Sequence, residues 1–212
     1  MMVMPANSGN NLIAYLAGKY PGQVGHLYSE RKEQPRFFWP YALDNGCYAA
    51  WKRGVDWDED WYFERLEHYM YLEHKPLWVA VPDVVSDKEK TLELWDKYAE
   101  RVKDRRFKIA FVAQDDMTPY DVPLNADVVF IGGSTEFKLR SLPMFCAVHE
   151  RVHVGRVNIF RRLVQCAKLG VESVDGCGFG RGGEETWKRL TNFLAWQNGE
   201  LKIPEQAELA YQ

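Results

Sequence analysis

Several features that mark special classes of protein are missing from this chain of 212 residues. It has only four cysteines, none in a C-x-x-C pair, so we expect reduced thiols and no disulfide framework. No apolar run approaches the roughly 18 residues that a membrane span needs. Signal-peptide patterns, low-complexity segments and Ser- or Pro-rich linkers are absent as well. The sequence therefore predicts one folded domain in the cytoplasm, with no membrane partner.

A strong charge of either sign is also missing. Lysine and arginine total 27 and the acidic residues 30, so the net charge of −3 does not indicate a nucleic-acid binder. The distribution is more informative, because one region holds a single acidic residue, Glu150, among seven basic ones: Lys138, Arg140, Arg151, Arg156, Arg161, Arg162 and Lys168. A basic face on a near-neutral protein is one interpretation; a solvated surface is the other.

Strand-like and helix-like segments alternate from one end of the chain to the other. The strand candidates are 2–5, 23–28, 41–43, 77–81, 107–113, 127–131, 151–154 and 171–174. The helix candidates are 10–20, 47–53, 58–73, a helix opening at the capping-box sequence 86–89, 135–145, 159–169 and 184–197. Eight alternations in one α/β domain predict a compact (β/α)8 TIM-type barrel over residues 1–197, followed by a polar C-terminal tail, 198–212. An open doubly wound sheet is the alternative.

Polar residues and glycines follow the predicted strands at their carboxyl ends. They are Asp44, Asp83, Gln114, Gly132-Gly133, Arg156 and Asp175. In barrels and in doubly wound sheets, functional residues gather at this edge. Each also has a structural alternative: Asp44-Asn45-Gly46 as a turn, Asp83 as a loop or cap residue, and Gln114 as a helix cap.

The stretch 171–183, VESVDGCGFGRGG, combines a strand with a glycine-rich loop. Asp175 ends the strand, the glycines let backbone N–H groups approach an anion, and Arg181 adds a positive charge six residues later. This pattern predicts an acidic nucleophile beside a phosphate-binding loop, with a plain glycine-rich turn as the alternative. The loop also matches G-x-G-x-x-G, but no strand with an acid follows, as a dinucleotide site requires.

A second motif, H-E-x-x-H at His149–His153, is typical of zinc enzymes. That chemistry requires both histidines on one helical face. Residues 152–155 alternate like a strand, so we expect no zinc site here.

The strand-end residues suggest one chemistry. Two carboxylates facing a common pocket, Asp44 and Asp175, can act on a glycosidic bond, one as nucleophile and one moving protons. Asp83 and Gln114 offer donors and acceptors suited to the edge of a purine-like base. Lys138, Arg156 and Arg181 can hold phosphates.

The ordered series over about residues 40–183 resembles the tRNA-guanine transglycosylases, and most closely their small DNA-modifying relatives from phages and bacteria. The resemblance is carried by Asp44-Asn45-Gly46-Cys47, Pro82-Asp83-Val84, Val112-Ala113-Gln114-Asp115, 131–136, Val154-Gly155, and Asp175 with Arg181. The chain departs from the family at Cys47, where a glycine is usual, and after Gln114, where two aspartates follow. The family's three zinc-binding cysteines are absent after Asp175, so no zinc subdomain is expected.

The resemblance implies that guanine in DNA is exchanged for a 7-deazaguanine such as preQ0, without metal or cofactor. Asp175 would be the nucleophile and Asp44 the general acid/base, roles that the residues alone leave interchangeable. Asn45, Asp83, Gln114, Gly132 and Gly133 would bind the base. Lys138, Arg156, Asn158 and Arg181 would contact the nucleic acid.

The partners implied are DNA with a flipped or single-stranded guanine and the free deazaguanine base, in a bacterial or phage-infected cell. The short length favours DNA over tRNA. A homodimer or a helper protein is left open, as are the deazaguanine used and the DNA sequence chosen. The alternatives are a base-excising glycosylase or nucleoside hydrolase, a non-catalytic nucleic-acid-binding subunit, and a phosphate-binding barrel enzyme acting on a small metabolite.

Overall fold

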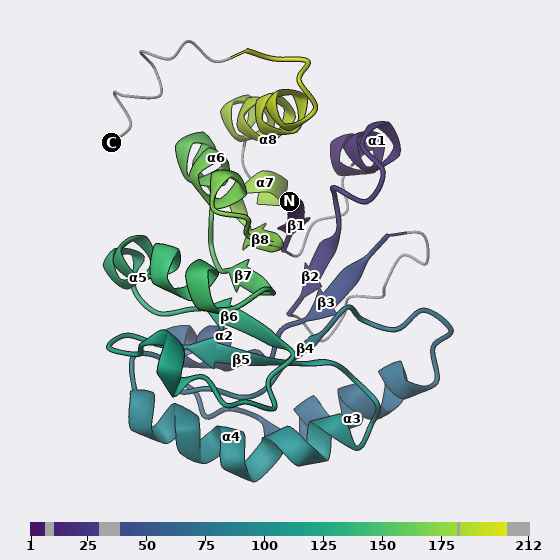
Figure 1. Cartoon of the computed structure of the whole chain (residues 1–212). Helices are drawn as coiled ribbons and strands as arrows, with labels where there is room; N and C mark the ends of the chain where they lie inside the picture. The colour runs from purple at the N-terminus through teal and green to yellow at the C-terminus, as the bar shows by residue number, and fades with distance from the viewer. Residues whose placement is uncertain (7–10, 30–38, 182, 203–212) are drawn as a thin grey trace.

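The centre of the fold is a ring of parallel strands, seen in a computed structural model that describes residues 1–6, 11–29, 39–181 and 183–202 (Figure 1). Within these residues the strands are β1 Met2–Pro5, β2 His26–Tyr28, β3 Tyr41–Leu43, β4 Val79–Ala80, β5 Ile109–Ala113, β6 Val128–Ile131, β7 Val152–Val154 and β8 Ser173–Gly176. Each strand from β2 to β8 pairs with its sequence neighbour, and β8 pairs with β1. Two parallel bridges, Val3–Val24 and Ala6–Leu27, close the ring between β1 and β2. The predicted (β/α)8 barrel is confirmed, and the open sheet is not what forms.

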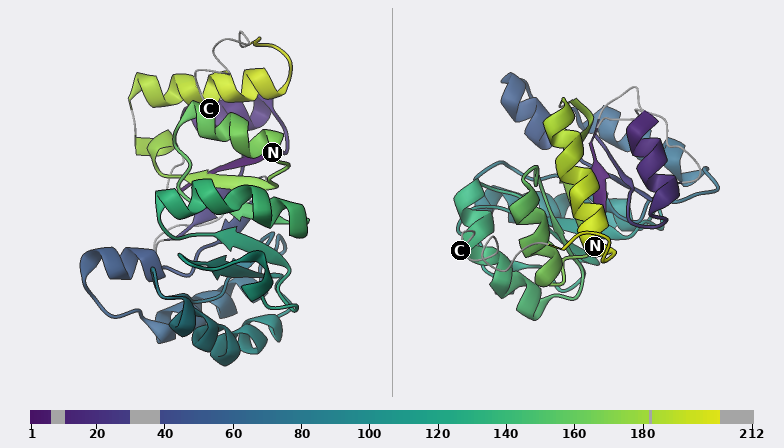
Figure 2. Two further views of the ribbon diagram at one scale, coloured as in Figure 1. Left: turned by 60° about the vertical axis from the view of Figure 1, so that its left-hand side comes forward. Right: turned by 90° about the horizontal axis from the view of Figure 1, so that it is seen from above.

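Helices surround the strands, as the views in Figure 2 show. In the described residues they are α1 Asn11–Lys19, α2 Cys47–Arg53, α3 Glu59–Met70, α4 Lys88–Lys103, α5 Thr135–Val148, α6 Phe160–Lys168, α7 Gly178–Arg181 and α8 Glu184–Gln197, with a 3-10 turn, η1, at Pro119–Asp121. Every predicted helix and strand range overlaps one of these elements. The predicted ranges include neither η1 nor the short α7, which lies inside the glycine-rich loop. None of the helices described is long and apolar enough to cross a membrane.

The start of α4 differs by one residue from the predicted capping box. Asp87 is the N-cap, and its carboxylate accepts a hydrogen bond from the Lys90 N–H at 3.0 Å. Ser86, expected to cap, has a positive φ of 59° and donates its backbone N–H to Gln114 Oε1 at 3.0 Å. This hydrogen bond joins the loop that follows β4 to Gln114, the residue after β5.

Two layers of apolar side chains hold the barrel. Alternate strand residues point inward and form a small interior cluster that includes Met4, Trp78, Val112 and Phe130. The opposite faces of the strands form a much larger cluster with the helices. The inward layer is filled around Trp78, and a cavity remains towards the carboxyl ends of the strands.

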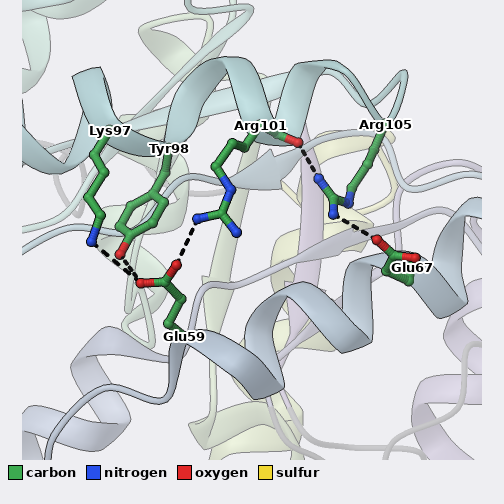
Figure 3. A network of polar contacts seen from close by, with 6 residues as sticks. All are labelled: Glu59, Glu67, Lys97, Tyr98, Arg101 and Arg105. Atoms are coloured by element: carbon green, nitrogen blue, oxygen red, sulfur yellow. Dashed lines mark hydrogen bonds and ion pairs between the residues drawn. The ribbon is translucent and has the colours of Figure 1, made fainter.

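On the outer surface, polar contacts join α3 to α4 (Figure 3). The Glu59 carboxylate accepts hydrogen bonds from Arg101 at 2.7 Å and from the Tyr98 hydroxyl, and Arg105 pairs with Glu67 at 2.7 Å. The Arg101 guanidinium also lies 3.7 Å from the centre of the Phe63 ring. These contacts join α3, whose Tyr62 hydroxyl donates to the Ala80 carbonyl in β4, to α4, which lies against β5.

The described residues that follow α8 contact the rest of the barrel. Asn198, assigned above to the tail, accepts a hydrogen bond from Gln23 at 2.9 Å. Glu200 pairs with Lys19 at 2.8 Å and accepts from the Tyr20 hydroxyl at 3.0 Å. Residues 203–212 of the predicted tail lie outside the described residues.

Candidate functional site

A cavity of about 240 Å³ opens at the carboxyl ends of the strands. Its walls include both predicted catalytic aspartates, all of the predicted base-binding residues and one predicted phosphate contact: Asp44, Asp175, Asn45, Asp83, Gln114, Gly132, Gly133 and Arg156. These residues lie between positions 44 and 175 of the sequence and come from the ends of six different strands, β3 to β8. Parallel strands that close into a barrel bring their ends to one rim, which is why they meet.

Asp44 follows β3 directly and is half-buried at the rim. Its Oδ1 accepts the Asn45 N–H at 2.9 Å, and its backbone carbonyl accepts from Arg65 at 2.8 Å. Burial, and then repulsion by Asp175, raise the pKa of Asp44 to about 6, while the charge of Arg65 opposes the rise. A carboxyl group with this pKa can both give and take a proton near neutral pH.

Asp175 lies in β8 and is only 6% exposed. Its Oδ1 accepts the backbone N–H of Arg156 at 3.1 Å, and the Nε2 atom of His153 lies 3.2 Å from the same oxygen. Arg156 has a positive φ of 58°, which is uncommon for a residue with a side chain. No hydrogen-bond donor in the described part of the chain reaches Oδ2 of Asp175, so this oxygen is available to a ligand in the cavity.

A buried set of amides holds Asp83 after β4. Asn45 Nδ2 donates to its Oδ1 at 2.7 Å, and Gln114 Nε2 donates to its Oδ2 at 2.6 Å. Burial raises the pKa of Asp83 to about 7, with the two amide hydrogen bonds opposing and Asp44 adding to the rise. The three side chains are oriented by one another before any ligand arrives, and each Asp83 oxygen keeps a further lone pair for one.

Helix α2 supplies cavity residues that the sequence reasoning missed, among them Tyr48 and Lys52. These two lie one helical turn apart and therefore share a face. The Arg156 guanidinium lies 4.4 Å from the centre of the Tyr48 ring and also donates to the carbonyl of Gly133, so it bridges across the cavity mouth. The available signal was an aromatic residue four positions after Asp44, in the first turn of a helix that starts at the rim.

Two other residues that were predicted to contact the nucleic acid, Lys138 and Asn158, make hydrogen bonds within the protein. Lys138 is buried, and its ammonium donates to the Gly155 carbonyl at 2.7 Å; burial, and then Arg156, lower its pKa to about 8. Asn158 accepts the Gly178 N–H at 2.9 Å and so holds the first residue of α7. Neither of these two side chains lines the cavity. The side chain of Arg181 lies outside the described residues.

The histidines of the H-E-x-x-H motif are separated by the fold, as the alternation of residues 152–155 predicted. His149 follows α5, with Nε2 3.0 Å from the Pro119 carbonyl, while His153 lies inside the barrel on β7. Within the residues that the structure describes, no group of three or more His, Cys, Asp or Glu side chains is placed to hold a metal ion. His153 is instead a neighbour of Asp175 that the sequence did not indicate.

Comparison with known proteins supports the fold alone. No protein-family model and no curated protein matches the chain. A solved structure of tryptophan synthase from M. tuberculosis, in an aminoacrylate- and BRD0059-bound form, superposes with a TM-score of 0.53 at 11% identity, covering 96% of this chain and 93% of the other. The open form of tryptophan synthase from M. tuberculosis with BRD0059 bound gives 0.52 at 9% identity, with the same coverage.

Proposed function

We propose that this protein is a base-exchange transglycosylase that replaces guanine in DNA by a 7-deazaguanine base through a covalent Asp175–deoxyribose intermediate. One observation carries the proposal: two carboxyl groups with different environments share a small cavity with a pre-oriented set of base-sized hydrogen-bonding groups. Asp175 has an oxygen available for attack, and Asp44 has a pKa of about 6. Pairs of carboxyl groups with such separated roles are typical of glycosyl transfer.

In the first half-reaction, Oδ2 of Asp175 attacks C1′ of the deoxyguanosine. The new C1′–O bond forms as the C1′–N9 bond breaks, and the bond electrons move to N9 of guanine. The protonated form of Asp44 gives its proton to that nitrogen, so guanine leaves as a neutral base.

In the second half-reaction, the incoming base occupies the place that guanine left. Asp44, now a carboxylate, takes the N9 proton of the 7-deazaguanine. N9 then attacks C1′ as the C1′–Oδ2 bond breaks, and its electrons return to Asp175. Two displacements at the same carbon retain its configuration, and no redox partner is needed.

The size and polarity of the cavity support a single base as the bound group. About 240 Å³ is below the roughly 300–1,000 Å³ typical of sites for drug-sized ligands. Asp83 and Gln114 offer acceptors and donors along one wall, and the Tyr48 ring offers an apolar surface. At Gly132 an added Cβ would lie 3.0 Å from Gln114 Nε2, so glycine leaves room for the Gln114 side chain in this wall.

A guanine paired in a duplex cannot reach this cavity. It must be unstacked first, at a cost of a few kcal/mol. Arg156 and Lys52 lie at the mouth, where contacts to flanking phosphates would offset part of that cost.

The test uses DNA with radiolabelled guanine, single- and double-stranded, with and without preQ0. Transglycosylation predicts a denaturation-resistant protein–DNA adduct with release of at most one equivalent of labelled guanine per enzyme without preQ0, and continued release of label once preQ0 is added. Release of many equivalents of label per enzyme without preQ0 would favour a base-excising hydrolase, which the same two carboxyl groups would serve. Asp175→Asn and Asp44→Asn are the matched variants, and tRNA is the control substrate. The absence of both adduct and release on all substrates would contradict the proposal.

A further inference from the structure

The buried histidine beside Asp175 has partners on both ring nitrogens. His153 is fully buried, with Nδ1 2.8 Å from the Ser173 hydroxyl and Nε2 3.2 Å from Asp175 Oδ1. Its ring makes edge contacts with Trp78 and Phe130, at centroid distances of 4.8 and 4.5 Å. An imidazole in such an apolar slot is held in place by its two polar contacts, because leaving either nitrogen unpaired there is unfavourable.

Strand register explains this arrangement. His153 on β7 is paired with Ser173 on β8, and Asp175 lies two residues further along β8. Residues two apart on a strand share a face, so both β8 side chains point into the barrel as His153 does. The histidine therefore reaches Ser173 beside it and Asp175 above it.

The proton on Nε2 follows from the chemistry of the partners. A carboxylate oxygen only accepts, so a hydrogen bond to Asp175 requires an N–H at Nε2. The Ser173 hydroxyl can donate to Nδ1 of the neutral ring or accept from it when the ring is charged. Ser173 thus satisfies Nδ1 in either state without competing for Asp175.

We infer that His153 is a positioning residue for the nucleophile, an inference that rests on the proposed function. Its Nε2–H, together with the Arg156 backbone N–H, holds Oδ1 of Asp175 and leaves Oδ2 to face C1′. Both donors remain on Oδ1 while Asp175 carries the sugar as an ester.

The two half-reactions depend on this donor differently. When Oδ2 attacks, the Nε2–H of His153 orients the carboxylate, which speeds the attack. The same N–H stabilises the negative charge of the free carboxylate, which slows the attack, so the two effects oppose each other. When the C1′–Oδ2 bond breaks, negative charge returns to the carboxylate, and a donor already in place at Oδ1 stabilises it. Loss of the donor is therefore expected to slow adduct breakdown more than adduct formation.

The variants are His153→Leu, which removes the donor, and His153→Gln, whose side-chain amide can place an N–H near the same oxygen. His149→Leu is the matched control, because His149 follows α5, contacts the Pro119 carbonyl and does not line the cavity. Circular dichroism and thermal unfolding confirm that each is folded. In single-turnover reactions followed by preQ0 addition, we expect His153→Leu to slow adduct breakdown about tenfold, equivalent to about 1.4 kcal/mol. Gln should restore most of the rate.

A second readout does not need a substrate. In ¹⁵N-labelled wild-type protein, the imidazole of His153 should carry a proton on Nε2, and its Nε2 shift should change in Asp175→Asn. An Nδ1–H tautomer, no response to Asp175→Asn, or wild-type adduct breakdown in His153→Leu would each overturn the inference. A wild-type protein that forms no adduct would contradict the proposed function instead, and the imidazole spectrum would then decide the inference alone.

Discussion

Replacing Asp44 by asparagine should stabilise the fold at alkaline pH while removing the proton donor of the proposed reaction. Burial and the negative charge of Asp175 raise the pKa of this carboxyl group from 3.8 to about 6. The folded state therefore binds the Asp44 proton more tightly than the unfolded chain does. Stability is lost as pH rises from about 4 to about 6, and the full penalty is present at pH 8.

The size of the effect follows from that difference. At about 1.36 kcal/mol for each pH unit, the penalty is at most about 3 kcal/mol. Asp44 is only half-buried, so solvent screening reduces the expected gain to about 1–2 kcal/mol at pH 8. Asparagine keeps an oxygen to accept the Asn45 N–H and carries no charge to repel Asp175.

Urea unfolding of wild type and Asp44→Asn at pH 4 and pH 8 measures this difference. The variant should gain stability at pH 8 and little or none at pH 4. Asp58→Asn is the matched control, since Asp58 caps α3 on the exposed surface and accepts the Trp61 N–H there. Equal or lower stability of Asp44→Asn at pH 8 would refute the account of a mutually repelling carboxyl pair.

Three further perturbations test other parts of the structure. Gly133→Ala should destabilise the fold by about 1–3 kcal/mol in thermal or urea unfolding, because the φ of Gly133 is +64° and the added Cβ would lie 2.7 Å from Oδ2 of Asp115. Gly170 has a φ of +77° but open space around it, so Gly170→Ala should lower the stability by only about 1 kcal/mol. Glu59→Gln should lower stability by less than about 1 kcal/mol, with the difference shrinking in 1 M salt, since the network around it is exposed. Arg156→Gln should weaken binding of single-stranded DNA and reduce its salt dependence by about one counterion in fluorescence anisotropy, whereas Arg140→Gln, which does not line the cavity, should do neither.

Strand-end position was enough to predict which polar residues meet at the rim. Asp44 and Asp175 each follow or end a strand, and closure of the barrel alone brings them to one cavity. Short apolar runs and helical patterns place nearly every element, because strands buried on both faces read as apolar runs and helices buried on one face show helical periodicity.

The burial of individual side chains and their hydrogen-bond partners could not be predicted from strand-end position. Lys138 was predicted to meet phosphate, yet it donates to a backbone carbonyl inside the fold, which a count of charges cannot show. His153 lay within a misleading zinc motif, and its contact with Asp175 depends on the register between β7 and β8. Local sequence carries no information on that register.

The most direct test of the central claim is to locate the covalent bond. Wild-type protein is incubated with guanine-containing DNA in the absence of preQ0, denatured, digested with nuclease and protease, and analysed by mass spectrometry. A deoxyribose-containing adduct on Asp175, absent from Asp175→Asn, is the predicted result. An adduct on Asp44, or one that persists in Asp175→Asn, would contradict the assignment of Asp175 as the nucleophile.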